Sequence, residues 1–373
     1  MKIISIGPAH PLRGGIADFN ERFTKELISL GHDASIISFS LQYPSVFFPG
    51  KTQYAPTKDL TKIPIYASIN STNPLTWFQT AKYIREQKPD VVFIQYWMPF
   101  FAPALGSIAN SIGKKHKTHI IGICHNFVSH EPKPGENTLN RFFIKKCTSA
   151  VAMSHTVAQD IREQHKSIKI IETPHPLYDN FGTTISKQEA CKTLHLNPDK
   201  KYILFFGLVR AYKGLDLLIE ACAQLQTPDT HILIAGEFYD SEKKYTDLIK
   251  KYSLEDTVTI HNSFIPQDKV HLYFSAADII AQTYHSATQS GITQIAYHFE
   301  KPMLVTNVGG LSEIVPHKKV GYVCEKNPND IAEALDDFFT HDRTDEFVSN
   351  IKQQKQLYTW EYFCKTIFNS LKV

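Results

Sequence analysis

Short apolar runs alternate with amphipathic stretches along this chain, and the alternation occurs in two separate series. The first series opens with an apolar run at residues 2–7, followed by a loop rich in glycine and proline, an amphipathic stretch at 17–30 and a second apolar run at 34–39. Apolar runs of this length predict buried strands, and apolar positions three and four residues apart predict helices. Because parallel strands need a crossover connection, this order predicts a parallel sheet covered by helices.

The remaining apolar runs extend both series. With 373 residues the chain exceeds one ordinary hydrophobic core, so each series is expected to form its own domain. The first series continues with strands at residues 91–94, 119–123 and 150–153. The second series has strands at 201–206, 231–234, 257–260, 278–281 and 302–305, with helices at 216–225 and 245–252.

Two prolines within residues 171–177 stiffen a hinge between the two series, and we place the domain boundary near Pro176. The expected domains are 1–176 and 177–345, followed by a C-terminal helical segment at 346–373. That segment is too aromatic for an exposed tail, so we expect it to dock on the first domain. It carries Tyr358, Trp360, Tyr362 and Phe363 close together.

The composition is that of a globular protein, with 42% hydrophobic and 21% charged residues. A net charge of +3 is too small to indicate a duplex nucleic acid partner, whose binding proteins concentrate lysine and arginine. The six cysteines include no CxxC pair, and no secretory leader precedes the first strand. We therefore expect reduced thiols in a cytoplasmic protein.

Residues 91–113 form the longest uncharged stretch and have the length of a membrane span. Because Pro99 and Pro103 interrupt it and Gln95 lies in its most apolar part, a buried strand, a loop and a short helix account for it better. The basic run at residues 114–117 has two interpretations. One is peripheral contact with an anionic membrane surface, and the other is a solvated turn.

The most informative loop runs from residue 206 to 214, between a strand and a helix. It contains Arg210, whose planar guanidinium can bind a phosphate through two N–H groups, and Lys213, which adds a second positive charge. The start of the following helix also favours anions. The alternative for this loop alone is a solvated basic turn. Its position between strand and helix favours a diphosphate site.

Three other segments place polar groups at the carboxyl edge of the second sheet. Residues 284–294 offer hydroxyls, an amide and a glycine, which can bind phosphate oxygens or sugar hydroxyls, although a plain polar loop has a similar composition. The segments at 235–237 and 308–314 bring Glu237 and Glu313 to the same edge.

In the first domain, Gly14 and Gly15 lie at the first strand-to-helix turn, where backbone N–H groups can approach a phosphate or sugar. His125 directly follows a buried strand and is expected at the carboxyl edge of the first sheet. It could orient a substrate hydroxyl or phosphate, or it could simply be hydrogen-bonded by its neighbours.

Taken together, these loops resemble those of the retaining glycosyltransferases of family 4. That family has an N-terminal glycine loop, an Arg...Lys-Gly loop opening the second domain, an aliphatic-Ala-Gly-Glu strand end, a GlyGly-x-x-Glu loop and a C-terminal helix that crosses back. The resemblance covers almost the whole chain. The matching residues, in order, are Gly14-Gly15, Arg210 with Lys213-Gly214, Ala235-Gly236-Glu237 and Gly309-Gly310-Leu311-Ser312-Glu313.

The resemblance implies the GT-B fold, in which two Rossmann-like domains face each other across a cleft and a C-terminal helix returns to the first. By this likeness Arg210 and Lys213 hold the donor diphosphate, and His125 faces the transferred sugar. Those three are the candidate catalytic residues, with no metal site and no cofactor besides the nucleotide sugar as substrate. The candidate donor-binding residues are Gly14, Gly15, Gly207, Gly236, Glu237, Phe264, Ile265, Thr288, Gln289, Ser290, Gly291, Gln294 and Glu313. Of these, Phe264 and Ile265 are expected near the nucleotide base.

The sequence departs from the family in one respect. The family carries two glutamates before the Lys-Pro strand, and the corresponding positions here hold Ala287 and Ile295. Neither side chain accepts a hydrogen bond from a hydroxyl. Residues 288–291 and Gln294 are the candidate replacements.

The leading hypothesis is a metal-independent, retaining transfer of a sugar from a nucleotide diphosphate donor to a glycan or lipid-linked acceptor. The missing glutamates motivate a second hypothesis, a nucleotide-sugar-binding protein without activity. A sugar-nucleotide epimerase or a phosphorylase of the same fold is a third. A dinucleotide oxidoreductase is disfavoured because no G-x-G-x-x-G follows a predicted strand.

Overall fold

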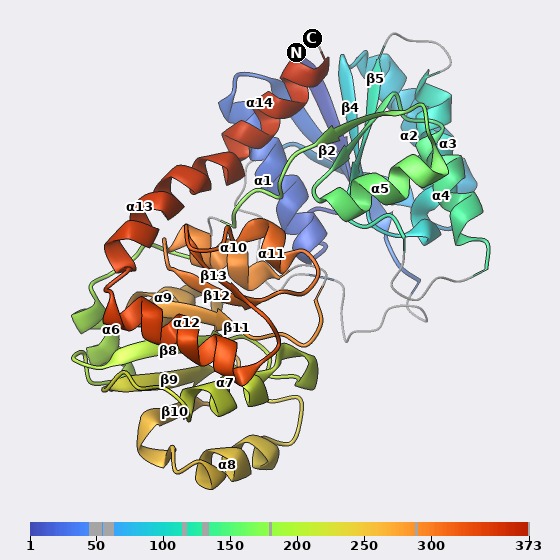
Figure 1. The fold of residues 1–373 in the computed structure, drawn as a ribbon. Helices are drawn as coiled ribbons and strands as arrows, with labels where there is room; N and C mark the ends of the chain where they lie inside the picture. Colours follow the sequence, from blue (N-terminus) through green and yellow to red (C-terminus); the bar gives the residue numbers. More distant parts are fainter. Residues whose placement is uncertain are drawn as a thin grey trace. The chain divides into compact units, whose positions relative to one another are not determined.

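The computed structural model describes residues 1–44, 54, 63–113, 118–128, 134–178, 181–287 and 290–371. The chain forms two compact units, each built around its own sheet (Figure 1). The first unit comprises Met1–His175 together with Trp360–Val373, and the second comprises Pro176–Thr359. Residues 114–117, the basic run for which membrane contact or a solvated turn is predicted, lie outside the described residues.

A seven-stranded parallel sheet forms the core of the first unit, in the order β3-β2-β1-β4-β5-β6-β7. The central strands are buried on both faces, which explains their continuous apolar sequences. The strands are β1 (Lys2–Ile6), β2 (Asp33–Leu41), β3 (Ile65–Asn70), β4 (Val91–Tyr96), β5 (His119–Cys124), β6 (Ser149–Ala152) and β7 (Lys169–Glu172).

Helices cover both faces of this sheet. Phe19 and Phe23 of α1 and Phe363 of α14 pack in one apolar cluster on one face, and Leu105 of α3 belongs to the cluster on the other. The helices of this unit are α1 (Gly15–Ser29), α2 (Pro74–Gln87), the 3-10 helix η2 (Pro99–Phe101), α3 (Ala102–Gly113), α4 (Glu136–Ile144), α5 (His155–Gln164) and α14 (Trp360–Leu371).

The second unit has a six-stranded parallel sheet in the order β10-β9-β8-β11-β12-β13. Its strands are β8 (Lys201–Phe206), β9 (Thr230–Ala235), β10 (Val258–His261), β11 (Ile279–Gln282), β12 (Met303–Thr306) and β13 (Gly321–Cys324). Both sheets therefore have the parallel, Rossmann-like arrangement predicted from the alternation of strands and helices.

The helices of the second unit form two layers. Residues of α6 (Lys187–Leu194), α9 (Val270–Ala276), α10 (Gly291–His298) and α11 (Leu311–Ile314) pack in the cluster on one face of the sheet. Residues of α7 (Leu215–Cys222), α8 (Glu242–Lys251), α12 (Pro328–Thr340) and α13 (Thr344–Gln354) pack in the cluster on the other. Short 3-10 helices complete the unit: η3 (Ala211–Lys213), η4 (Glu255–Thr257), η5 (Gln267–Lys269) and η6 (Lys355–Tyr358).

The C-terminal segment, expected as one helix from residue 346, is divided between the units. The helix α13 and Tyr358 belong to the second unit, where the Tyr358 ring lies 4.9 Å from that of Tyr297. Trp360 begins α14 in the first unit, and its ring lies 5.0 Å from that of Phe19. Tyr362 is 38% exposed, so the aromatic residues of α14 are not all buried.

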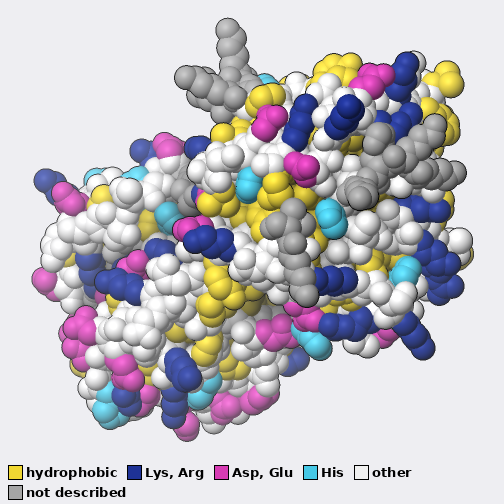
Figure 2. Space-filling model, turned by 90° about the horizontal axis from the view of Figure 1, so that it is seen from above, with side chains coloured by type: hydrophobic (Ala, Val, Ile, Leu, Met, Phe, Trp, Pro, Cys, Tyr) yellow, Lys and Arg dark blue, Asp and Glu magenta, His cyan; other side chains and the backbone are white. Residues whose placement is uncertain are grey.

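The uncharged stretch at 91–113 folds as the buried strand β4, the 3-10 helix η2 and the helix α3, as predicted. Within the described ranges, no helix combines the length and apolarity needed to cross a bilayer. Figure 2 shows basic and acidic side chains interspersed over the face that it displays, which agrees with the small net charge.

Candidate functional site

The loop after β8 is fixed by glycines that cannot be replaced without displacing backbone. At Gly214, where φ is 65°, a Cβ would lie 1.9 Å from the carbonyl oxygen of Thr283. The hydroxyl of Thr283 donates a hydrogen bond of 2.7 Å to the Gly214 carbonyl. The loop is therefore held against the carboxyl end of β11, as expected for a site at the edge of a parallel sheet.

Lys213 is buried within this loop, with only 9% of its surface exposed. Its ammonium lies 5.9 Å from the centre of the Tyr284 ring, and a Cβ on Gly207 would lie 3.4 Å from it. Burial, together with the nearby charge of Arg210, lowers the pKa of Lys213 to about 8. A bound anion would supply the stabilisation that the charged form of Lys213 lacks.

Arg210 lies at the start of η3 and is exposed. The carbon of its guanidinium group is 4.7 Å from the centre of the Tyr239 ring, a distance typical of a cation–π contact. The backbone of Tyr239 is fixed by a 3.0 Å hydrogen bond from its N–H to the Val209 carbonyl. The stacked guanidinium keeps its N–H groups for another partner.

The end of β9 packs against the end of β8. Gly236 has a φ of 152°, and a Cβ there would lie 2.0 Å from the Gly207 carbonyl oxygen. The carbonyl of Glu237 accepts a 2.9 Å hydrogen bond from the Val209 N–H, while its side chain is exposed. Gly207, Gly236 and Glu237 thus lie together; Gly236 must be glycine because of this clash, and Gly207 because its φ is 90°.

The start of α10 lies beside the same loop, since the Ile292 side chain comes within 3.5 Å of a Cβ built on Gly207. Ser290 caps the helix by accepting a 3.2 Å hydrogen bond from the Ile292 N–H, and its hydroxyl lies 3.2 Å from that of Tyr284. No described atom would lie within 4 Å of a Cβ on Gly291. The structure therefore brings Ser290 and Gly291 to the side of the loop that holds Lys213.

Of the other predicted residues in this region, Gln294 is 5% exposed and its Oε1 has no hydrogen-bond partner among the described residues. An orphaned buried amide oxygen needs a water or ligand donor. Thr288 and Gln289 lie outside the described residues. Ile295, at one of the family's glutamate positions, is 6% exposed and packs in the apolar core.

Asp216 in the first turn of α7 was not among the predicted site residues. It accepts hydrogen bonds from His285 Nε2 at 3.1 Å and from Lys244 Nζ at 3.2 Å. Burial raises the pKa of Asp216, but these two partners outweigh it and lower the pKa below its usual value. The Asp216 carboxylate is thus paired with two side chains of this unit, and no described side chain caps the start of α7. In the sequence, the signal for Asp216 was its place in the first turn of the predicted helix at 216–225, where an acidic residue is favoured.

Phe264 and Ile265 follow β10, and Glu313 lies in α11. Phe264 is 70% exposed, which leaves its ring available to stack on a ligand. Ile265 packs against the apolar core of the unit. Glu313 makes no hydrogen bond or ion pair within the part of the chain that the structure describes.

In the first unit, Gly14 precedes α1 with a φ of 124°, a conformation that requires glycine, and Gly15 begins the helix. Both are exposed, and a Cβ on either would meet no atom of the described residues within 4 Å. The start of α1 is therefore open to a ligand, which is consistent with the glycine loop predicted there.

His125 directly follows β5, where its N–H donates a 2.8 Å hydrogen bond to the Tyr96 carbonyl. Its Nε2 lies 2.8 Å from Oε1 of Gln95, and its ring packs edge-on against Phe19 at 4.7 Å. Burial, with a smaller contribution from His175, lowers the pKa of His125 to about 3. The half-buried imidazole is therefore neutral near pH 7.

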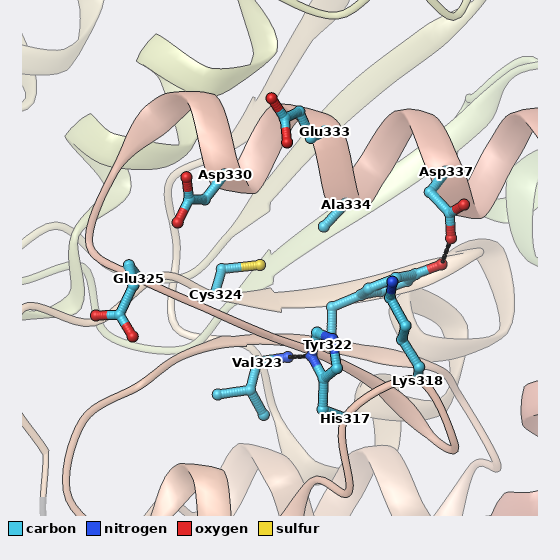
Figure 3. Close-up of a pocket in the computed structure, with 10 residues that line it drawn as sticks. All are labelled: His317, Lys318, Tyr322, Val323, Cys324, Glu325, Asp330, Glu333, Ala334 and Asp337. Atoms are coloured by element: carbon cyan, nitrogen blue, oxygen red, sulfur yellow. Dashed lines mark hydrogen bonds between the residues drawn. The ribbon is translucent and has the colours of Figure 1, made fainter.

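A cavity of about 380 Å³ lies between β13 and α12, at the edge of the second sheet (Figure 3). Asp330 and Glu333 project from α12 along its rim, and Asp337 accepts a 2.5 Å hydrogen bond from the Tyr322 hydroxyl. With Glu325, the cavity lining holds four carboxylates and one lysine, Lys318. This negative lining is unsuited to a diphosphate, unlike the loop of Arg210 and Lys213.

Both halves of the chain match known families. Residues 13–176 match the family described as Glycosyltransferase Family 4, and residues 186–356 match the family described as Glycosyl transferases group 1. An uncharacterized glycosyltransferase of Methanocaldococcus jannaschii is 23% identical, covering 100% of this chain and 98% of its own. The N-acetyl-alpha-D-glucosaminyl L-malate synthase of Bacillus anthracis is 22% identical, covering 85% of this chain and 82% of its own.

Solved structures share the fold at low sequence identity. HepE of Anabaena in complex with UDP aligns with a TM-score of 0.70 at 16% identity, over 100% of both chains. The apo form of the lipopolysaccharide outer core galactosyltransferase WaaB aligns with a TM-score of 0.68 at 14% identity, over 99% of this chain and 100% of its own.

Proposed function

The chain belongs to the group 1 glycosyltransferases of family 4, with the GT-B fold, and we propose that it transfers a sugar with retention of configuration and without a metal ion. Members of this group take the sugar from a nucleotide-sugar donor. The proposed donor is a nucleoside diphosphate sugar, and the proposed acceptor is a glycan or a lipid-linked molecule. The observation that carries the proposal is the pair of cations, Arg210 and Lys213, on the loop that β11 and the start of α10 hold in place.

The two cations suit the chemistry of the leaving group. When the bond between the anomeric carbon and the diphosphate breaks, the electron pair stays on the phosphate oxygen as negative charge. Arg210 can bind phosphate oxygens through two N–H groups, and Lys213 adds an ammonium in a buried position where its electrostatic effect is strong. Because these groups are fixed before the reaction, they stabilise the developing charge without reorganising.

The other candidate residues receive roles around this diphosphate. We assign Gly207, Gly236 and Glu237 to the backbone wall beside the phosphates, and Ser290, Gly291 and Gln294 to the sugar or ribose in place of the family's glutamates. The orphaned Oε1 of Gln294 supports this assignment. Thr288, Gln289 and Glu313 complete the proposed donor set.

UDP is the first nucleotide to test, because a structural relative, HepE, was solved with UDP. Phe264 and Ile265 are assigned to the nucleotide base, since the exposed ring of Phe264 offers a stacking surface. In the first unit, Gly14 and Gly15 are assigned to the donor and His125 to the transferred sugar.

A thermal-shift screen with UDP-, GDP-, ADP- and CMP-sugars tests donor binding, because a ligand that binds only the folded state raises the melting temperature. Turnover of the donor found is then measured with and without chelator, and the anomeric configuration of the product is read by NMR. The double variant Arg210→Ala with Lys213→Ala should lose turnover. The exposed lysine of α8 provides the control Lys250→Ala.

Undiminished turnover by the double variant, loss of activity with chelator, or an inverted product would each refute part of the mechanism. Tight donor binding without turnover across a broad acceptor panel would favour the inactive binding protein, for which the apolar Ile295 is the structural argument. Product formed without any acceptor would favour an epimerase, and dependence on inorganic phosphate a phosphorylase.

A further inference from the structure

Three buried polar side chains connect the first strand of the chain to His125. They are Ser5 of β1, Asn20 of α1 and Gln95 of β4, and none is more than 1% exposed. Buried polar groups are costly unless they are hydrogen-bonded, so the directions of their hydrogen bonds are strongly determined. Those directions establish which nitrogen of His125 carries its proton.

The network begins at a backbone carbonyl, which can only accept. The Pro8 carbonyl accepts a 3.1 Å hydrogen bond from Asn20, so the Asn20 amide nitrogen must face it and Oδ1 must face the other way. Oδ1 accepts from the hydroxyl of Ser5 at 2.6 Å and from Nε2 of Gln95 at 3.3 Å. Gln95 Nε2 also lies 3.3 Å from the Ser5 hydroxyl oxygen.

The orientation of the Gln95 amide follows from these contacts. With its nitrogen directed at Asn20 and Ser5, its oxygen Oε1 faces His125 at 2.8 Å. A carbonyl oxygen accepts only, so His125 Nε2 must donate. In the neutral imidazole the other nitrogen, Nδ1, then carries a lone pair, and no hydrogen-bond partner for it occurs among the described residues.

We infer that His125 presents a hydrogen-bond acceptor, Nδ1, to a hydroxyl group of the bound sugar, and that Gln95 is the positioning residue that keeps the proton on Nε2. The role toward the sugar rests on the proposed function, whereas the tautomer does not. A neutral imidazole fixed in this way cannot donate to a phosphate or a carbonyl oxygen through Nδ1. It selects a ligand group that carries its own proton.

Gly7 provides a second, independent means of disturbing Gln95. A Cβ on Gly7 would lie 2.6 Å from Cγ of Gln95 and 2.9 Å from its Cβ. These atoms are close to the Gln95 backbone, so Gly7→Ala must displace the amide rather than only bend its end. Gln95→Met removes the amide while keeping a similar volume. Ile94→Val, one residue earlier in β4, removes a buried methyl group on the opposite side of the strand and is the matched control.

The first experiment records long-range proton–nitrogen correlation spectra of the ligand-free protein with ¹⁵N-labelled histidine. The chain has 17 histidines, and the signals missing from His125→Gln identify His125. We expect a protonated Nε2 and an unprotonated Nδ1 in the wild type and in Ile94→Val. Gln95→Met and Gly7→Ala should show mixed tautomers. A protonated Nδ1 in the wild type, or an unchanged tautomer in Gln95→Met, would overturn the inference.

The second experiment measures turnover and UDP binding in the same variants. Only the molecules that keep the proton on Nε2 remain competent, so kcat/KM should fall in proportion to that fraction, about twofold or more, in Gln95→Met and Gly7→Ala, while the Kd for UDP stays unchanged. Unchanged kcat/KM in both variants, despite mixed tautomers, would overturn the role toward the sugar. If the wild type turns over no sugar nucleotide, the proposed function fails, and the spectra still decide the role of Gln95.

Fluorinated donors test the direction of the hydrogen bond. Fluorine accepts weakly but cannot donate. If Nδ1 is an acceptor, replacing the contacted sugar hydroxyl by fluorine should slow the reaction as much as replacing it by hydrogen. The electronic effect of fluorine is measured separately with His125→Gln and subtracted. A fluorinated donor that regains the lost activity would show that His125 donates, and would overturn the inference.

Discussion

The ammonium of Lys213 lies over the Tyr284 ring, 5.9 Å from its centre, and the Tyr284 hydroxyl is 3.2 Å from that of Ser290 at the start of α10. A positive charge is thus linked through one aromatic ring to a helix start, although the three residues come from two different loops. Both features favour an anion at the same place. Lys213 and the start of α10 are therefore joined through Tyr284 in the second unit, where we propose that the diphosphate binds.

Replacing Lys213 by methionine should weaken the binding of UDP by about ten- to a hundredfold, since a hydrogen bond to a charged group contributes about 1.5–3 kcal/mol. Isothermal titration calorimetry at constant ionic strength measures this loss. Lys250→Met, on the exposed side of α8, should bind like the wild type. Equal affinities in the two variants would remove Lys213 from the diphosphate site.

The affinity for UDP should also depend on pH through Lys213. Its pKa in the free protein is lowered to about 8, and a bound diphosphate would raise it, because the anion stabilises the ammonium. Binding therefore takes up a proton above about pH 8, and affinity should fall as the pH rises past that value. Calorimetry in buffers of different ionisation enthalpy measures the uptake. In Lys213→Met the uptake should disappear, and its persistence would assign it to another group.

The same shift makes a prediction about folding. Because the pKa of Lys213 is lower in the folded state than its ordinary value of 10.5, the unfolded chain binds more protons between about pH 8 and 10.5. The contribution of Lys213 to the free energy of unfolding therefore increases with pH across that window. Urea denaturation of the wild type and Lys213→Met at several pH values isolates this contribution. A difference between the two proteins that does not change from pH 7.5 to 10 would contradict it.

Gly236→Ala should destabilise the second unit by about 2 kcal/mol or more, because φ is 152° and the new Cβ would lie 2.0 Å from the Gly207 carbonyl oxygen. Gly291→Ala is the contrasting variant for stability. Its Cβ would meet no atom within 4 Å in the part of the chain that the structure describes, and it lies within α10, where alanine is favoured over glycine. Thermal denaturation compares the two. Equal melting temperatures would show that the β8 and β9 ends do not need this close approach.

The sequence predicted the strands that lie inside each sheet, since strands buried on both faces have continuous apolar runs. Of the four edge strands it predicted β10 but missed β3, β7 and β13. In β7 only one of four residues is buried, and charged residues occupy both ends, so no apolar run stands out. The strand β13 has only four residues and begins with a glycine. Edge strands receive much of their stability from a single neighbour, which local sequence does not reveal.

For the candidate site, the sequence predicted the loop of Arg210 and Lys213 because strand, cations and glycine are contiguous there. It did not predict Gln95 as part of a site. Its polar side chain in an apolar run argues against a membrane span and by itself indicates nothing further. A buried amide needs partners, and that requirement was the available signal, but the partners Ser5 and Asn20 are 90 and 75 residues away. Only the fold shows that they meet.

The contact between α14 and α1 gives the last prediction. Phe363 is 1% exposed and packs against Phe19 and Phe23, with ring centres 5.8 Å apart in both pairs. Truncating it should cost about 3–5 kcal/mol, because Phe363→Ala removes buried apolar surface and leaves a cavity. Tyr362, its neighbour on the same helix, is 38% exposed, so Tyr362→Ala should cost well under half as much. Urea denaturation followed by tryptophan fluorescence reports on this unit, because the three tryptophans of the chain, Trp77, Trp97 and Trp360, all belong to it. Similar losses in the two variants would mean that α14 is not held by this aromatic contact. Since α14 packs on the helix that begins at Gly15, a loosened α14 should also disturb the glycine loop.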